Sequence, residues 1–312
     1  MTEKLINQPG PNFKDCTNMA SVNGHAEPYM NGHANGVAEE KTRVILWTVP
    51  RSISTAFERC MGGLDNVELI HEPYVTAYYF GPEKRYHHAP FMPTDEGYSY
   101  SDVKKKLEAD FEDRDVVFCK DMAYALDDKF EMLPKGYKHT FLIRDPVKAH
   151  ASMHKLCTKP WLLNYSLIDL VMPQGYAFKQ LWDLYEHVTE VLKEDTVVID
   201  ADDLLCYPEQ VIRRYCTATG LQFNNGMLEW KSNVDITQNW SSSLKLLNYV
   251  GVYESAMKSN SFFKHTPCAK RKKDTDVSSL PEDVQKAIEI SQPFYDKLYR
   301  VRIIPEDLET EV

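Results

Sequence analysis

Five short runs of nearly continuous apolar residues constrain the fold of this chain more than any other feature. They lie at residues 43–48, 67–70, 116–119, 140–143 and 196–199. Apolar runs without alternation are typical of strands that are buried on both faces, as in a parallel sheet covered by helices. The sequence therefore predicts a sheet that lies inside the protein.

Patterns typical of helices separate these runs. They lie at residues 55–61, 101–111, 147–156, 175–193 and 208–219, and a last helix at 281–298 is expected to pack on the outside. Pro208 suits a first helical turn, and Gly220 suits the stop of the same helix. Strands that alternate with helices predict an α/β fold with a largely parallel sheet.

The first 40 residues differ in composition from the rest of the chain. They are rich in Asn, Gly, Pro and His, and they bury too little apolar surface to offset the entropy that ordering costs. We predict a disordered N-terminal tail at residues 1–40 and one domain at residues 41–312.

Charge and cysteine content narrow the class of protein. A formal net charge of -10 argues against a general nucleic-acid binder, which needs a broad basic face. No stretch approaches the ~18 apolar residues of a membrane span, and no secretory or transit peptide is visible. Seven cysteines without paired spacing fit reduced thiols better than a disulfide framework. We expect a cytoplasmic protein; the sequence does not predict its oligomeric state.

A strand–loop–helix junction at residues 43–55 carries the strongest sign of a binding site. Such a junction directs backbone N–H groups and the positive end of the helix dipole at one point, which favours an anion. The guanidinium of Arg51 adds a positive charge, and the nearby hydroxyl groups add donors. We predict that a phosphate or phosphosulfate group binds to Pro50, Arg51, Ser52, Ile53, Ser54 and Thr55.

Two other interpretations of this junction stay open. Its Ser and Thr residues are of the types that cap a helix without binding any ligand. A kinase or ATPase would need the pattern G-x-x-x-x-G-K-[ST]. This loop contains no glycine, and Gly-Lys-Ser/Thr occurs nowhere in the chain.

A second candidate anion-binding segment follows the fourth apolar run. Arg144 leaves the carboxyl end of that predicted strand, where ligands of open α/β sheets bind. Ser152 lies about two turns into the next predicted helix, and a guanidinium with a hydroxyl suits a second phosphate group. The alternative is that Arg144 pairs locally with Asp145.

Together these segments resemble the PAPS-dependent sulfotransferases. The junction is similar to the 5′-phosphosulfate loop of that family, in the form Pro-Arg-x-Ile-Ser-Thr of one branch, and Arg144 with Ser152 is similar to its 3′-phosphate motif. Residues 117–122 and 197–205 are similar to two further family segments. The resemblance implies a three-layer P-loop fold with a central, mainly parallel β-sheet flanked by helices. It also implies PAPS as co-substrate and PAP as product, with no metal expected.

The resemblance implies a reaction as well. A sulfotransferase moves a sulfonate group from PAPS to a hydroxyl or amine of a small acceptor, in line. We expect Arg51 and Lys120 to stabilise charge in this step. Met122 stands where cytosolic members carry their catalytic histidine, and a thioether cannot take a proton.

The base must therefore be another residue, or be absent. Glu72 follows the second apolar run, and other sulfotransferase branches use a glutamate after this strand, so we expect Glu72 to be the base. His71 and Asp121 are the alternatives, and Glu72 is otherwise a partner of Arg51.

The acceptor is only weakly indicated. Residues 74–100 are rich in Tyr and Phe, and so long a loop is either a lid or acceptor pocket, or a loop that packs its rings on the core. We expect a small-molecule acceptor that is aromatic or apolar. The run Lys270 to Lys273 fits closure over a 3′-phosphate, a nuclear-import patch or a solvated loop. A P-loop kinase or hydrolase, and a catalytically silent binding module, stay open as alternative functions.

Overall fold

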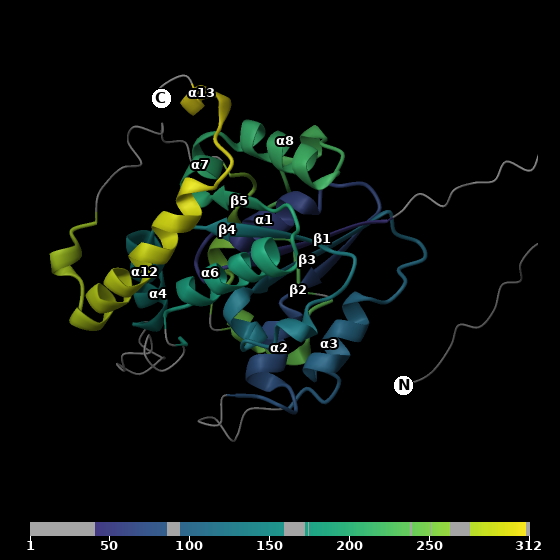
Figure 1. Ribbon diagram of the computed structural model, residues 1–312, viewed down its shortest axis with the longest axis horizontal. Helices are drawn as coiled ribbons and strands as arrows, with labels where there is room; N and C mark the ends of the chain where they lie inside the picture. Colours follow the sequence, from purple (N-terminus) through teal and green to yellow (C-terminus); the bar gives the residue numbers. More distant parts are fainter. Residues whose placement is uncertain are drawn as a thin grey trace, which may run out of the picture. The chain divides into compact units, whose positions relative to one another are not determined.

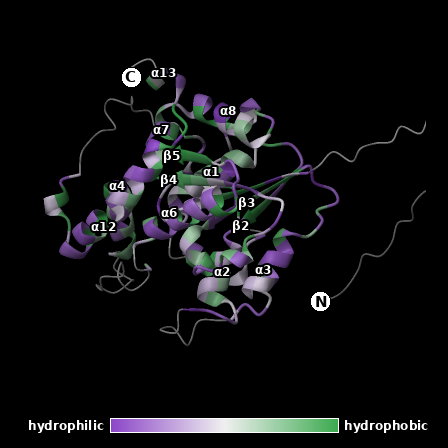
Figure 2. Ribbon diagram, viewed as in Figure 1, coloured by the Kyte–Doolittle hydropathy of each residue, from purple (hydrophilic) through white to green (hydrophobic). Residues whose placement is uncertain are grey.

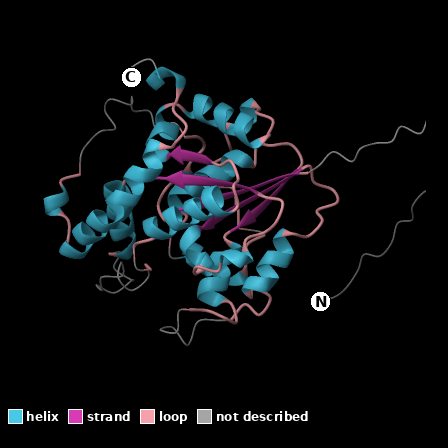
Figure 3. Ribbon diagram, in the orientation of Figure 1, coloured by secondary structure: helices cyan, strands magenta, loops and turns pink. Residues whose placement is uncertain are grey.

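A five-stranded sheet forms the centre of the computed structural model, which describes residues 41–85, 94–158, 172–173, 175–237, 239–249, 251–262 and 275–309. The strands are paired in the order β2-β3-β1-β4-β5, and every pair is parallel (Figures 1 and 3). Their bounds are β1 (Thr42–Thr48), β2 (Val67–His71), β3 (Val116–Met122), β4 (Lys138–Ile143) and β5 (Val197–Asp200). The predicted α/β fold with a parallel sheet is confirmed.

Both faces of the sheet are buried, as the continuous apolar runs predict. Val44 and Leu46 of β1 belong to one core, while Ile45 and Trp47 belong to another. Successive side chains of a strand point to opposite faces, so these two cores lie on opposite sides of the sheet. The strands are accordingly among the most hydrophobic parts of the molecule in Figure 2.

Helices complete the outer two layers. α1, α7 and α8 contribute to the core that contains Leu46, and α2, α3 and α6 contribute to the core that contains Trp47. The helices are α1 (Ser54–Met61), α2 (Pro73–Phe80), α3 (Tyr100–Leu107), α4 (Pro146–Cys157), α6 (Phe178–Glu186), α7 (Ala201–Cys206), α8 (Pro208–Thr219), α9 (Ser242–Tyr249), α10 (Glu254–Lys258), α12 (Glu282–Arg300) and α13 (Glu306–Glu309). Short 3-10 turns are η1 (Ala123–Leu126), η2 (Phe130–Met132), η4 (Asn225–Met227) and η5 (Val277–Ser279), and η3 (His187–Val191) is a π-helix.

Three helices depart from the sequence prediction. The stretch predicted to be helical to residue 111 ends at Leu107, whose carbonyl accepts hydrogen bonds from Arg43 and Tyr137 instead of continuing the helix. α6 gives way to a π-helix after Glu186. α2 lies in the segment predicted to be a loop. Six of its eight residues are buried, so it lacks the polar face that marks a helix in a sequence.

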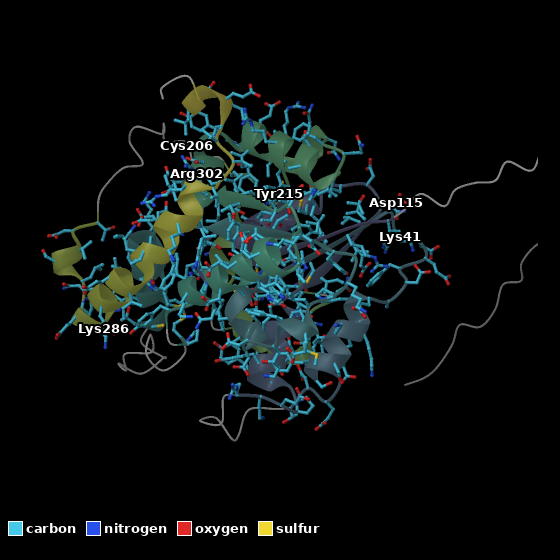
Figure 4. The ribbon with its side chains drawn as sticks, in the orientation of Figure 1. Lys41, Asp115, Cys206, Tyr215, Lys286 and Arg302 are labelled. Atoms are coloured by element: carbon cyan, nitrogen blue, oxygen red, sulfur yellow. The ribbon has the colours of Figure 1, made fainter. Side chains whose placement is uncertain are left out.

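The last long helix packs on the outside, as predicted. α12 packs on α4 and α6, and Tyr295 of this helix donates a hydrogen bond to Asp200 at the end of β5. Just after α12, Arg302 bonds Asp203 of α7 at 2.7 Å (Figure 4).

The two edges of the sheet have different roles. Lys41 directly precedes β1 and Asp115 directly precedes β3, so in Figure 4 these two labelled residues mark the edge at which the parallel strands begin. At the opposite edge, the neighbouring strands β1 and β4 end, and their connections leave in opposite directions, toward β2 and toward β5. Such a topological switch point is where ligands of open α/β sheets bind.

Some predictions fall outside the described residues, namely the N-terminal tail at 1–40 and the run Lys270 to Lys273.

Cys60, Cys119, Cys157 and Cys216 are buried free thiols, as expected. Cys206 departs from that expectation, because it is disulfide-bonded. Among the described helices, none combines the length and apolar character needed to cross a membrane.

Candidate functional site

The loop between β1 and α1 has the backbone of an anion site. Arg51 and Ile53 both have a φ of 65°, in the left-handed region that residues with a Cβ atom rarely adopt. Ile53 is the N-cap of α1, and within the described residues no side-chain hydrogen bond caps this helix. The N–H of Ala56 donates to the carbonyl of Ile53 at 2.9 Å, so within the described residues the N–H groups of Ser54 and Thr55 are the first-turn donors left for a ligand at the positive end of the helix.

The side chain of Arg51 connects this loop to two other segments. Its Nε donates to Oγ of Ser152 in α4 at 3.1 Å, and its Nη1 donates to the carbonyl of Val252 at 2.7 Å. Arg51 and Ser152, which the sequence assigned to two different phosphate-binding motifs, are thus in direct contact.

Arg144 reaches the same loop from the end of β4. Its Nη1 donates to the backbone carbonyl of Arg51 at 2.6 Å, and its buried Nε has no hydrogen-bond partner within the described residues. In the described part of the chain, neither guanidinium forms an ion pair with a carboxylate. Burial, and then the charge of Arg144, lowers the pKa of Arg51. Two neighbouring cations without a paired carboxylate make this edge of the sheet attractive to an anion.

A cavity of about 730 Å³ opens at this edge of the sheet. Its polar wall contains Pro50, Arg51, Ile53, Ser54, Thr55, Arg144 and Ser152. Its apolar and aromatic wall contains Val75, Tyr79, Phe80, Met122, Tyr124, Leu247 and Val252. The carboxylate residue Glu72 and the phenol residue Tyr253 also line it. This volume is in the range of small-molecule sites.

Ser52 is the member of the predicted loop whose hydroxyl is directed elsewhere. Its side chain is fully buried and shares a hydrogen bond with the hydroxyl of Thr48. The hydroxyl of Ser52 therefore holds the turn, and of this residue only the backbone is left for a ligand.

Glu72 is held by three neighbours at the start of α2. Its φ of 48° is left-handed, and Pro73 follows it as the first residue of the helix. One carboxylate oxygen pairs with Nζ of Lys120, and the other accepts a hydrogen bond of 2.8 Å from the hydroxyl of Tyr253. Burial alone would raise the pKa of Glu72, but Lys120, His71 and the hydrogen bonds outweigh burial and lower it. Glu72 is therefore ionised at neutral pH.

The other two candidate bases are engaged elsewhere. Within the described lining of the cavity, neither His71 nor Asp121 contributes a side chain. Asp121 is fully buried and accepts backbone hydrogen bonds from Tyr74, Val75 and Met122. Burial and the charge of Glu72 raise the pKa of Asp121 to about 8, while these backbone bonds act in the opposite direction.

Lys120, the second residue expected to stabilise charge, has Glu72 as its partner. Its side chain is fully buried, is paired with Glu72 and is outside the described lining of the cavity. That Lys120 stabilises charge in the transfer stays a prediction. β3 continues through Met122, so Lys120 lies two residues before the end of the strand. From there its ammonium pairs with the carboxylate of Glu72.

Val252 and Tyr253 both line the cavity, although neither was predicted as a site residue. The carbonyl of Val252 accepts from Arg51, and the next side chain, Tyr253, donates to Glu72. This pair therefore links the predicted anion site to the predicted base. A tyrosine in a segment without periodicity offers no signal of such a role.

The aromatic segment at residues 74–100 packs some of its rings on the core and directs others to the cavity; its role as an acceptor pocket stays a prediction. Tyr74 and Tyr100 are buried in the core, whereas Tyr79 and Phe80 line the cavity. Tyr86 and Phe91 lie outside the described residues.

Among the residues that the structure describes, no group of three His, Cys, Asp or Glu side chains is arranged to hold a metal ion.

Similar proteins include a relative and several solved structures. The relative is an Arabidopsis thaliana protein named "Branched-chain-amino-acid aminotransferase-like protein 2", 25% identical over 202 residues that make up 60% of this chain and 31% of that protein. This chain thus matches less than a third of its relative's length.

Two solved structures illustrate the likeness in fold. The sulfotransferase domain from the curacin biosynthetic pathway is 16% identical, with a TM-score of 0.49 over 85% of this chain and 99% of that one. Mouse sulfotransferase SULT7A1 complexed with PAP is 12% identical, with a TM-score of 0.44 over 84% and 90%. At these TM-scores the likeness is loose.

The family assignment rests instead on the sequence. The family model described as "Sulfotransferase domain" matches residues 42–245, well over half of the chain. This match runs from β1 to α9 and includes the loop after β1, Glu72, Arg144 and Ser152. The chain belongs to the sulfotransferase domain family.

Proposed function

We propose that this protein transfers a sulfonate group from PAPS to a hydroxyl or amine of a small, apolar acceptor. The observation that carries the proposal is the pair Arg51 and Arg144, which line one cavity without a partner carboxylate in the described residues. PAPS has anionic groups at both its 5′ and 3′ positions, so it needs two cationic centres in one cavity. P-loop kinases and ATPases use the loop G-x-x-x-x-G-K-[ST], whose lysine has no counterpart here.

Each end of the donor has suitable groups in the structure. The first-turn N–H groups of α1, with Ser54 and Thr55, are suited to the phosphosulfate end. Arg144 and Ser152 are suited to the 3′-phosphate. Arg51 lies in the loop before α1 and donates a hydrogen bond to Ser152, so it is next to the residues assigned to the phosphosulfate and to those assigned to the 3′-phosphate.

Glu72 is the group that we assign as base. As the acceptor oxygen forms its bond to sulfur and the S–O bond to the nucleotide breaks, the acceptor proton passes to the carboxylate of Glu72. Arg51 and the N–H groups of α1 stabilise the charge that develops on the departing phosphate oxygen. Lys120 and Tyr253 act through Glu72, because they hold its carboxylate in place and ionised.

The other wall of the cavity supports an apolar or ring-bearing acceptor. Val75, Tyr79 and Phe80 come from α2, Tyr124 comes from η1 and Leu247 comes from α9. The hydroxyls of Tyr79 and Tyr124 hydrogen-bond each other at 3.1 Å, which leaves mainly ring surface for contact with an acceptor.

Calorimetry with nucleotides tests the proposal. PAP should bind without Mg²⁺ and at least tenfold more tightly than ATP or GTP with Mg²⁺. A preference for ATP or GTP with Mg²⁺ would identify a kinase or hydrolase and refute the proposal.

A transfer assay separates an enzyme from a silent binding module. Labelled PAPS is incubated with a panel of small phenols, alcohols and amines, and labelled products are measured. Transfer to apolar members of the panel supports the proposal, whereas tight PAP binding without transfer to any of them indicates a protein that binds the nucleotide only.

A further inference from the structure

Two buried titratable groups behind Glu72 have no part in the chemistry described so far. Glu58 of α1 and His71 at the end of β2 are in contact, with Oε2 of Glu58 at 2.5 Å from Nδ1 of His71. On the other side of the ring, Nε2 of His71 lies 3.6 Å from Oε2 of Glu72. The side chains of Glu58, His71 and Glu72 are only 8%, 2% and 4% exposed. A buried imidazole thus lies between two buried carboxylates.

The imidazole of His71 is fixed in this orientation by aromatic rings. The indole of Trp240 stacks on it with ring centroids 3.7 Å apart and an interplanar angle of 5°. The ring of Tyr253 meets it edge-on at 5.2 Å. Nε2 has no hydrogen-bond partner within the described residues, and Glu72 is the acid that it faces. A structural histidine normally has both ring nitrogens satisfied, so the free Nε2 needs an explanation.

We propose that Glu58 and His71 form a proton store that takes over the acceptor proton from Glu72. Before transfer, His71 carries its proton on Nδ1 and donates it to ionised Glu58, which leaves a lone pair on Nε2. The proton on Glu72 moves to Nε2, and the proton on Nδ1 moves to Glu58. The imidazole is neutral before and after, and Glu72 is ionised again. Glu58 returns the proton by the same route once the cavity is open to water.

The charges around the cluster suit this direction of transfer. The groups that face His71 are Glu58 from α1, Glu72 before α2, Lys120 from β3 and Tyr253 before α10. Burial, and next Lys120, lower the pKa of His71, so a lasting imidazolium is disfavoured. Burial raises the pKa of Glu58 to about 7, although Lys120 acts against it. Glu72 has a lowered pKa and so gives up the proton that Glu58 can hold.

The first test uses the free protein and needs no substrate. Histidine is labelled with ¹⁵N, and the tautomer of His71 is followed by long-range ¹H–¹⁵N NMR between pH 5 and pH 9. We expect one tautomer change with a midpoint near pH 7, from Nδ1–H above it to Nε2–H below it. In Glu58→Gln this step should vanish. His139, a buried histidine bonded to Trp47, should keep one tautomer throughout. A His71 that keeps one tautomer in the wild type, or that becomes an imidazolium, would overturn the proposal.

The second test measures transfer, and it rests on the proposed function. With PAPS and 2-phenylethanol, whose hydroxyl does not ionise in this range, the kcat of the wild type should rise with pH to a plateau above pH 7. Glu58→Gln should stay about tenfold below that plateau and approach the wild type near pH 5.5, with an unchanged Kd for PAP. A loss of the same size at every pH would show a merely structural role. Failure to bind PAP would refute the proposed function, while the NMR result would still decide the fate of the proton store.

Discussion

The guanidinium of Arg144 donates a hydrogen bond of 2.6 Å to the backbone carbonyl of Arg51 and so ties the end of β4 to the loop after β1. The contact brings two positive charges together at the topological switch point of the sheet. Arg144 lowers the pKa of Arg51, so each charge makes the other less favourable. A bound polyanion would remove this cost, which is the physical basis of the nucleotide site that we propose.

Arg144→Ala should weaken PAP binding about 10- to 100-fold, because charge-assisted hydrogen bonds to one phosphate are lost. Adenosine 5′-phosphosulfate lacks the 3′-phosphate, and its affinity should change much less. Calorimetry with both nucleotides measures the difference. Arg213→Ala is the matched control, since Arg213 is about half exposed and pairs with Glu209 on the surface of α8. Equal losses for the two nucleotides would contradict the assignment of Arg144.

Glu72→Gln should lower kcat by about 10²- to 10⁴-fold, the usual contribution of a positioned base. The affinity for PAP should be unaffected, since no donor contact is assigned to Glu72. Initial rates with labelled PAPS, together with calorimetry, check both parts. Glu68→Gln is the control, since Glu68 lies on β2, the strand that ends just before Glu72, and pairs with Arg114. A variant that turns over at the wild-type rate would exclude Glu72 as the base.

Lys120→Met should destabilise the fold by about 3–5 kcal/mol, because it leaves Glu72 buried without its counter-ion. The double variant Lys120→Met, Glu72→Gln should recover part of that loss, since the uncompensated charge is gone. Urea denaturation of the single and double variants measures the coupling. Strictly additive effects would show that the two side chains do not depend on each other.

Glu58→Gln should change how stability depends on pH. Burial raises the pKa of Glu58 from 4.5 to about 7, so the folded state holds a proton that the unfolded state releases between these values. The stabilisation is complete below pH 4.5 and is lost as the pH rises to about 7, with a total of roughly 3 kcal/mol. The free energy of unfolding of the wild type relative to Glu58→Gln should therefore fall over this interval. If the free energies of unfolding of the wild type and of Glu58→Gln changed with pH in parallel, Glu58 would have the same pKa in the folded and unfolded states.

The sheet could be predicted from the sequence, and the residues of the proposed anion site could be assigned to the ends of its strands, because both signals are local. Apolar runs mark the five strands, since strands buried on both faces cannot alternate. Arg51 and Arg144 follow such runs directly, and the ends of adjacent parallel strands meet at one edge of the sheet. The strand order, with β1 next to β4, was not predicted and comes from the structure.

The surroundings of Glu72 could not be predicted in the same way. Lys120, Tyr253 and Glu58 reach Glu72 or His71 from three different elements, so only the packed structure shows that they form one cluster. α2 was not predicted, because most of its residues are buried and its sequence therefore lacks the polar face by which a helix is recognised. Contacts between segments that are far apart in the sequence produce no periodic pattern of residues, so they could not be predicted from the sequence.

A crystal structure of the protein with PAP tests the central claim most directly. We predict that the 5′-phosphate lies at the first turn of α1 beside Arg51 and that the 3′-phosphate contacts Arg144 and Ser152. Electron density that places either phosphate away from these side chains, or the nucleotide outside this cavity, would contradict the account.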